Sequence, residues 1–244
     1  SDSGVVSFTA ADNALTITEI DASGAAADGV VISVADLAAA TKITLGAGDV
    51  TLTTSDNVDT VVTGSGDATI ISTAGGAFTF GTGKDVITAK VASIGANDIT
   101  GFDVAKDVIN LDISEADGFT GSNVPVDYAG TPLVGALSAA TIVDETGGAA
   151  FTMDAGTILR LAGTYADTAA VEAAIEGDME DLSLADEDAM VVIWSDGANA
   201  HIDLYEIDAV AGGVVSAVTF NGEFAQLIGT DVTKLTDANF DFIA

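Results

Sequence analysis

Glycine-rich corners recur along the first half of the chain, and they restrict its fold more than any other feature. The corners lie in the segments LGAGDVTL (45–52), TGSGDATI (63–70), FGTGKDVI (80–87) and TGFDVAKDVI (100–109). Their aspartates, Asp49, Asp67, Asp85 and Asp103, follow one another at intervals of 18 residues. Glycine permits tight corners and β-branched residues favour extended chain. Each unit therefore predicts a turn followed by a short strand.

A unit of this length, with two turns and two strands, predicts one coil of a parallel β-solenoid. Weaker half-repeats lie between the corners: SDNVDTV (55–61), TAGGAFT (73–79) and GANDI (95–99). Because one coil buries its apolar row only by stacking on its neighbours, the coils must come in series. Leu52, Ile70 and Ile87 are expected to form one row of the stacked interior.

The corner at residues 80–87 resembles a known family. Gly81, Gly83, Asp85 and Ile87 fall on the specified positions of the pattern G-G-x-G-x-D-x-U-x, with Phe80 where the first glycine belongs. The segment is similar to the calcium-binding nonapeptide repeats of the repeats-in-toxin (RTX) family. The resemblance implies a β-roll and a Ca²⁺ ion held by Asp85 and the corner glycines Gly81 and Gly83.

The two preceding corners match the pattern less closely. In Gly64-Ser65-Gly66-Asp67 the aspartate comes one residue early and Ala68 takes the usual ligand position, and Asp49 is placed in the same way. Calcium takes about six to eight oxygen ligands, which aspartates and exposed corner carbonyls can supply. Gly64, Gly66, Asp67, Asp49 and Asp103 are therefore further calcium candidates. The alternative is that Asp49 and Asp67 only cap turns by accepting hydrogen bonds from the backbone two residues on.

Residues 98–112 (DITGFDVAKDVINLD) resemble the segment that follows such repeats in RTX proteins, I-x-x-F-x-x-x-x-D-x-I-x-L. The alternation of Ile109 and Leu111 predicts a strand that closes the end of the solenoid, and Phe102 is expected to cover the apolar cap. The expected fold is mainly β. A β-solenoid (RTX-like β-roll) occupies residues 1–111, and a β-rich C-terminal domain with one or two short helices occupies residues 112–244.

The N-terminal residues 1–43 are assigned to the start of the solenoid. Strands are expected at 14–20 and 29–35, where apolar and polar residues alternate. Residues 36–43 predict either a helical turn with Asp36 as its N-cap or another corner. Ile32 and Leu37 are expected in the core.

The C-terminal half has a different pattern. A loop is expected at 123–132 and two strands at 149–163 around Asp154-Ala155-Gly156. A short helix over 168–176 is expected to be capped by Asp167 and ended by Gly177, with Val171 and Ile175 facing inward. Residues 189–207 predict a hairpin whose turn is Ser195-Asp196-Gly197-Ala198-Asn199.

The end of the chain resembles proteins exported by bacterial type I (ABC transporter) machinery. The features are the W-x-D-G-x-x-A-H-x-x-L-Y hairpin, the run L-I-G-T-D-V-x-x-L at 227–235 and the final T-D-A-N-F-D-F-I-A. The resemblance implies a type I exporter as a partner and secretion or display on a bacterial cell surface. Such signals are read without cleavage, which agrees with a start, SDSGVVSFTA, that lacks a basic and apolar signal.

Charge and composition exclude several classes of partner. Six Lys and Arg against 38 Asp and Glu give a net charge of -32, which argues against nucleic acid and anionic membranes. The hydrophobic fraction of 48% argues for a folded chain with an acidic surface. There is no cysteine, so no disulfide forms. No apolar run reaches the roughly 20 residues that a membrane-spanning helix needs.

The chain has few residues of the types that usually catalyse reactions, and we expect that it is not an enzyme. His201 is the only histidine, expected in a cross-strand pair of the hairpin, and no G-x-S-x-G motif accompanies it. A zinc site needs three or four His, Cys or carboxylate ligands, and a chain with one histidine and no cysteine makes such a site improbable. Trp194 with Tyr205 could form a sugar platform, but core packing is the commoner use of such a pair. Arg160 is the sole arginine, which disfavours cleavage of acidic polysaccharides.

The leading hypothesis is a secreted, calcium-dependent structural protein that assembles with itself, as an S-layer, filament or biofilm-matrix subunit. Cell-surface polysaccharide is a further partner on this hypothesis. The first alternative is a non-catalytic export and folding module of a larger secreted hydrolase or epimerase. The second is an adhesin domain that binds glycans through the hairpin at 189–207.

Overall fold

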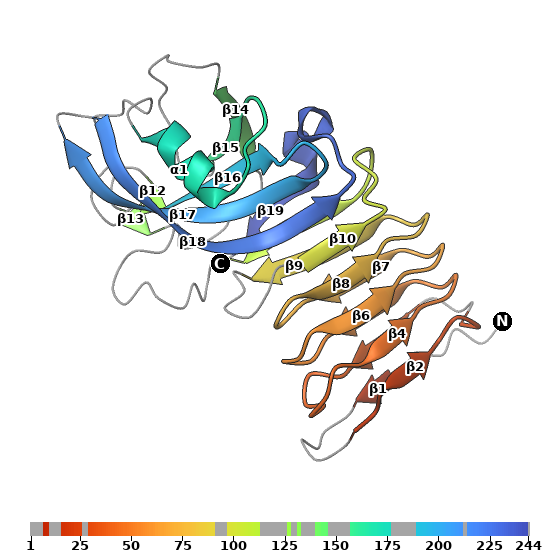
Figure 1. Cartoon of the computed structure of the whole chain (residues 1–244). Helices are drawn as coiled ribbons and strands as arrows, with labels where there is room; N and C mark the ends of the chain where they lie inside the picture. Colours follow the sequence, from red (N-terminus) through yellow and green to blue (C-terminus); the bar gives the residue numbers. More distant parts are fainter. Residues whose placement is uncertain are drawn as a thin grey trace.

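In a computed structural model, the described part of the chain is mainly β, with parallel sheets and one α-helix (Figure 1). The structure describes residues 7–9, 16–25, 29–90, 97–112, 126–127, 131–132, 140–145, 157–176, 189–211 and 214–243. The first two residues of the strand predicted at 14–20, the first of the two strands predicted at 149–163 and Gly177 lie outside these residues.

One sheet has seven strands, all parallel. In spatial order they are β1 (Ser7–Thr9), β3 (Val30–Ser33), β5 (Val50–Thr53), β7 (Ala68–Ile71), β9 (Asp85–Lys90), β11 (Val108–Asp112) and β19 (Phe240–Ile243).

The other main sheet has ten strands. In spatial order they are β14 (Thr141–Glu145), β15 (Thr157–Leu161), β16 (Ala189–Ser195), β17 (Ala200–Ala211), β18 (Val214–Ile228), β10 (Asn97–Thr100), β8 (Gly76–Thr79), β6 (Asp59–Val62), β4 (Lys42–Thr44) and β2 (Glu19–Asp21). β17 is antiparallel to both its neighbours, and the other pairings are parallel. A short antiparallel pair, β12 (Val126–Asp127) with β13 (Thr131–Pro132), lies within the expected loop at 123–132.

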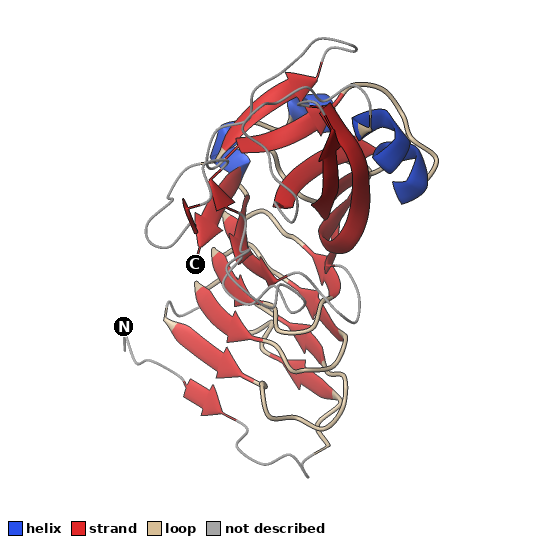
Figure 2. Ribbon diagram, turned by 90° about the vertical axis from the view of Figure 1, so that its left-hand side faces the viewer, coloured by secondary structure: helices blue, strands red, loops and turns tan. Residues whose placement is uncertain are grey.

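Successive strands from β1 to β11 belong alternately to the two sheets, so each strand pairs with the next strand but one. Figure 1 shows these strands stacked in steps away from the C-terminal part, with β1 and β2 at the far end. Figure 2 shows that the helices lie at the other end of the molecule. Two apolar faces meet between the sheets because every second side chain of each strand points inward.

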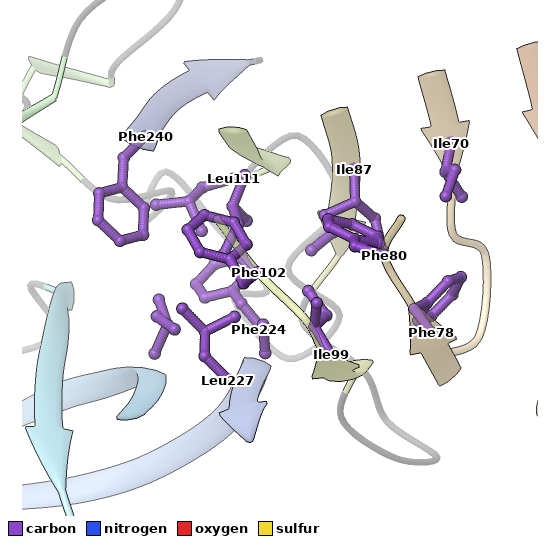
Figure 3. Close-up of a cluster of buried hydrophobic side chains, with 14 of the residues drawn as sticks. Ile70, Phe78, Phe80, Ile87, Ile99, Phe102, Leu111, Phe224, Leu227 and Phe240 are labelled. Atoms are coloured by element: carbon purple, nitrogen blue, oxygen red, sulfur yellow. The ribbon is translucent and has the colours of Figure 1, made fainter. Parts of the chain in front are cut away.

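The expected interior row is confirmed. Leu52, Ile70 and Ile87 are register partners and fully buried. The row continues at both ends, in the order Phe8, Ile32, Leu52, Ile70, Ile87, Ile109 and Phe240. A second row from the other sheet, Ile43, Val61, Phe78, Ile99 and Leu227, faces it. Figure 3 shows part of this core.

The interval of 18 residues does not survive as a structural register. Val50 pairs with Ala68, which is 18 residues on, but Ala68 pairs with Asp85 after 17 residues. The next step, from Val86 to Val108, is longer. Asp85 therefore stands beside Ala68 rather than beside Asp67, because the corners contain different numbers of residues.

The strand containing Ile109 and Leu111 forms as β11, but it does not end its sheet. β11 pairs with β9 on one side and with β19 on the other. In the ten-stranded sheet, β18 pairs in the same way with β10. Both sheets thus continue across residue 111 into the C-terminal half. Phe102 is nearly buried in this core, with its ring centroid 6.3 Å from that of Phe80.

The N-terminal strand predictions are confirmed in part, because residues 16–18 are described and lie outside any strand. β3 lies within 29–35, and β2 overlaps the end of 14–20. Residues 36–41 form a corner and contain no helix, so the second of the two alternatives applies. Ile32 and Leu37 are buried in the core, as predicted.

The C-terminal helix and hairpin are also confirmed. α1 (Thr168–Ile175) begins after Asp167, whose carboxylate accepts a hydrogen bond from Ala170 N, and it buries Val171 and Ile175. Glu172 of α1 accepts a hydrogen bond from Phe220 N in β18. Two 3₁₀ turns, η1 (Val232–Lys234) and η2 (Asp237–Asn239), lead into β19. No helix in the described part of the chain is long and apolar enough to cross a membrane.

Candidate functional site

Two successive strands, one in each sheet, together with their corners are called a coil below. Among the described residues, three aspartates at such corners are fully buried and share one geometry. Asp85 is the example from the predicted set. Its Oδ1 accepts a hydrogen bond from Ala68 N of the preceding coil at 3.2 Å. Its Oδ2 accepts bonds from Gly81 N, four residues earlier, at 3.2 Å and from the Thr63 hydroxyl at 2.8 Å. The carboxylate therefore links its own corner to the coil before it through hydrogen bonds.

Asp107 and Asp59 repeat this arrangement. Asp107 accepts hydrogen bonds from Asp85 N at 2.9 Å and from Asp103 N, four residues earlier, at 2.8 Å. Asp59 accepts them from Thr41 N at 2.6 Å and from Ser55 N at 2.7 Å. Asp59 was not singled out by the sequence, because the 18-residue frame does not pass through it.

Burial raises the pKa of Asp85 above its usual value, against the opposing effect of the hydrogen bond from Thr63. Burial likewise raises the pKa of Asp107, and the amides of Asp103 and Asp85 partly oppose the shift. Removing a carboxylate from water disfavours its charged form, whereas hydrogen bonds from amides favour it.

The other predicted aspartates are exposed. Asp49 Oδ1 accepts a hydrogen bond from Asp67 N at 3.0 Å, and Asp67 Oδ1 accepts one from Lys84 N at 2.7 Å. Each of these two side chains therefore caps the next coil, not its own backbone two residues on. Asp103 does cap locally, since its Oδ1 accepts a hydrogen bond from Ala105 N at 3.0 Å, and its Oδ2 lies 3.6 Å from Lys106 Nζ.

The glycines of these corners are required by stacking. A Cβ at Gly64 or Gly81 would lie 1.8 Å from the carbonyl oxygen of the glycine in the coil before it, Gly46 or Gly64. Gly66 and Gly83 face the same restriction, at 2.3 and 2.0 Å. The Gly64 carbonyl also accepts a hydrogen bond from Thr82 N at 3.1 Å. The corner backbones are thus bonded to one another from coil to coil.

These contacts indicate which of the predicted aspartates could bind calcium. Asp85 does not fit a calcium ligand as it stands, because it is buried and both its oxygens accept hydrogen bonds. Asp49 and Asp67 fit better, because they are exposed and their described bonds use only Oδ1. Within the described residues, the four predicted aspartates do not converge into a group of three metal-ligating side chains. Calcium at these corners stays a prediction.

The sequence analysis did not predict a polar cluster that spans β17 and β18. His201 Nδ1 lies 2.8 Å from Glu223 Oε1, and Asp203 lies beside them. His201 and Asp203 are two residues apart on β17, so their side chains share a face. This H-x-D spacing was the available signal, but Glu223 is too far along the chain to be linked to it by pattern.

The aromatic residues of the hairpin belong to the core. Trp194 pairs with His201, as the expected cross-strand pair of the histidine, and their rings stack with centroids 4.0 Å apart. Tyr205 pairs with Met190 instead of Trp194. Both Trp194 and Tyr205 are buried, so they offer no sugar platform.

A cavity of about 800 Å³ lies between β15, the hairpin turn and η1. Arg160 borders it, but its guanidinium is held by Asp144, with Nη2 2.9 Å from Oδ2. It also donates to the carbonyls of Val232 and Leu235. The arginine thus fastens η1 to the sheet.

Comparison with known proteins gives no match. No protein-family model matches the chain, and no curated protein and no solved structure matches it.

Proposed function

We propose that this protein is a secreted structural subunit of a bacterial cell surface or extracellular matrix, and that it assembles with copies of itself. On this proposal residues 1–111 form a β-solenoid of the RTX type, and further copies stack on the two open ends of the seven-stranded sheet, β1 and β19. Export by a type I transporter, suggested by the C-terminal resemblance, completes the proposal.

The supporting observation is the open ends of the seven-stranded sheet. Among the described strands, β1 and β19 each have a neighbour on one side only. Phe8 of β1 is the register partner of Ile32 and so continues the interior row, yet it is 38% exposed. An unpaired strand is a template for another strand, and because this sheet is all parallel, β19 of one copy can add to β1 of the next.

Charge gives the reason for a dependence on cations. A subunit with a net charge of -32 repels its copies, and ordinary salt screens such charges only beyond roughly 8–10 Å. Calcium would reduce this repulsion at exposed carboxylates such as Asp49 and Asp67. The proposal does not depend on calcium at the buried Asp85.

Electron microscopy of the purified chain tests the proposal. The chain is treated with a chelator and then returned to calcium, to magnesium or to sodium alone at equal ionic strength. Ordered sheets or fibres in calcium only are the expected result. Monomers under all three conditions, by microscopy and light scattering, would overturn self-assembly.

The same experiment separates calcium from general screening. Assembly that is equal in magnesium and calcium would retain the structural role but reject a calcium requirement. A parent gene with a catalytic domain upstream of Ser1 would instead favour the export-module alternative. The adhesin alternative loses its aromatic platform, because Trp194 is buried.

A further inference from the structure

The polar cluster of His201, Asp203 and Glu223 lies away from the coil corners and plays no part in the proposed assembly. One ligand atom from each of the three residues can be chosen so that all three lie within 4.8 Å of one another. Two of the residues come from β17 and the third comes from β18, at the centre of the ten-stranded sheet.

A β-bulge brings the third residue to the cluster. His201 pairs with Gln226 and Ile202 with Ala225, but Asp203 pairs with Glu223, so Phe224 is the extra residue on β18. Phe224 and Ala225 both point into the apolar core. In a regular ladder Phe224 would stand opposite Asp203, and Glu223 would be on the other face. The bulge therefore places a carboxylate where strand alternation would not put it.

Asp203 leaves one carboxylate oxygen unsatisfied. The residue is 1% exposed, and its Oδ2 accepts hydrogen bonds from Trp194 Nε1 at 2.6 Å and from the Tyr205 hydroxyl at 3.4 Å. Its Oδ1 is buried and has no hydrogen-bond partner among the described residues. A buried carboxylate oxygen without a donor is costly, and a cation would relieve that cost.

The surroundings add negative charge. Asp196 Oδ2 lies 3.4 Å from His201 Nε2, and Asp98 of β10 is close enough to interact electrostatically with Glu223 and His201. His201 is the one basic group that these described carboxylates face in the cluster.

Neighbouring side chains hold the ligands in place. The indole of Trp194 donates to Asp203 and stacks on the imidazole of His201 at an interplanar angle of 10°. Outer contacts of this kind orient the ligands of metal sites. His201 and Glu223 are partly exposed, so an ion has a route from solvent.

We propose that His201, Asp203 and Glu223 form a binding site for a divalent transition-metal ion of the zinc type. One imidazole nitrogen and two carboxylate oxygens suit zinc and its first-row neighbours, whereas calcium takes oxygen ligands. The ion would replace the direct contact between His201 and Glu223 and would supply a partner to Asp203 Oδ1. Water would complete its coordination.

Zinc titration of the full chain tests this site. The chain is stripped with a chelator and titrated with zinc chloride in excess calcium, which occupies exposed carboxylates. One zinc ion per chain is expected, with a change in tryptophan fluorescence, since Trp194 is the only tryptophan. The single imidazole of His201 is expected to shift in nitrogen-15 NMR spectra of the same unmutated protein.

Variants assign the ligands. Asp203→Asn and Glu223→Gln are each expected to weaken zinc binding by more than the roughly 10–100-fold that outer-shell changes cost. Asp208→Asn removes one exposed carboxylate from the same strand, outside the cluster, and is expected to bind as the unmutated chain does. Zinc that leaves the His201 resonance unchanged would overturn the site, and so would unaltered affinity in a folded Asp203→Asn chain.

Discussion

At the scale of single residues, the buried aspartates act as fasteners between coils. Asp85 receives three hydrogen bonds, two from Thr63 and Ala68 at the corner of the preceding coil and one from Gly81 N in its own corner. The sequence located Asp85 through the RTX pattern. It could not tell a metal ligand from a backbone fastener, since both uses require a carboxylate beside a glycine corner.

Replacement of Asp85 by alanine tests the fastener role. Asp85→Ala removes the acceptor of the Ala68 amide and of the Thr63 hydroxyl, so we expect a loss of about 3 kcal/mol in the free energy of unfolding, measured in urea without calcium. Asp56→Ala, at an exposed corner position, is the control and is expected to change it little. Equal effects of the two substitutions would contradict the role.

Asp203 predicts a dependence of stability on pH in metal-free protein. Burial raises the pKa of Asp203 in the folded state to about 7, from its ordinary 3.8, so between these values the folded state binds a proton that the unfolded state has lost. Stability should therefore fall as pH rises from about 4 to 7, by about 4 kcal/mol from this group alone.

His201 acts in the same direction, because its raised pKa gives stability that is lost as pH rises through the folded value. Urea unfolding at several pH values measures the sum. In Asp203→Asn the slope between pH 4 and 7 should be much smaller. A slope unchanged by this substitution would show that Asp203 does not titrate as described.

At the scale of elements, local sequence pattern predicted individual strands and the helix. It did not predict which distant strands pair with one another. Alternation located β3, β11 and the hairpin, and capping by Asp167 located α1. The interior row was predictable because Leu52, Ile70 and Ile87 follow glycine corners at similar distances. The strand register beyond Asp67 was not predictable, because the corners differ in length while the alternation within the strands stays the same.

The pairing of β10 with β18 joins residues such as Asn97 and Ala225, which no local signal connects. The bulge at Phe224 also depends on tertiary packing, since it lets two successive side chains enter the core. For this reason the cluster around His201 could not be assembled from sequence alone.

The stacked corners predict a strong effect of glycine replacement. In Gly64→Ala the new methyl group would overlap the carbonyl of Gly46, so the coils must separate. We expect a loss of about 2–3 kcal/mol, measured by urea unfolding. Gly24→Ala is the matched control, because a Cβ there meets nothing within 4 Å. A Gly64→Ala chain as stable as the control would mean that the corners are not stacked this closely.

At the scale of the whole molecule, acidity and open sheet edges act against each other. The net charge of -32 keeps copies apart, whereas β1 and β19 offer strands for pairing. Calcium or another cation would decide the balance. Composition alone predicted the acidic surface, but the location of the open edges required the sheet order.

A single substitution separates edge pairing from surface charge. Phe8→Asp places a carboxylate in the interior row at the open end and is expected to abolish assembly in calcium. Ile71→Asp adds the same charge at a side chain of equal exposure, 38%, on the central strand β7, and should still assemble. Light scattering and electron microscopy provide the comparison. If both variants assemble equally, β1 is not the contact.

The single direction of all strands in the seven-stranded sheet gives an assembly of this kind a polarity. One terminus of a growing fibre would present β1 and the other would present β19, and the two would elongate at different rates. A chain carrying Phe8→Asp keeps an intact β19, so it can still add to the terminus that presents β1. It would halt elongation at the terminus that presents β1 and leave the opposite terminus free to grow.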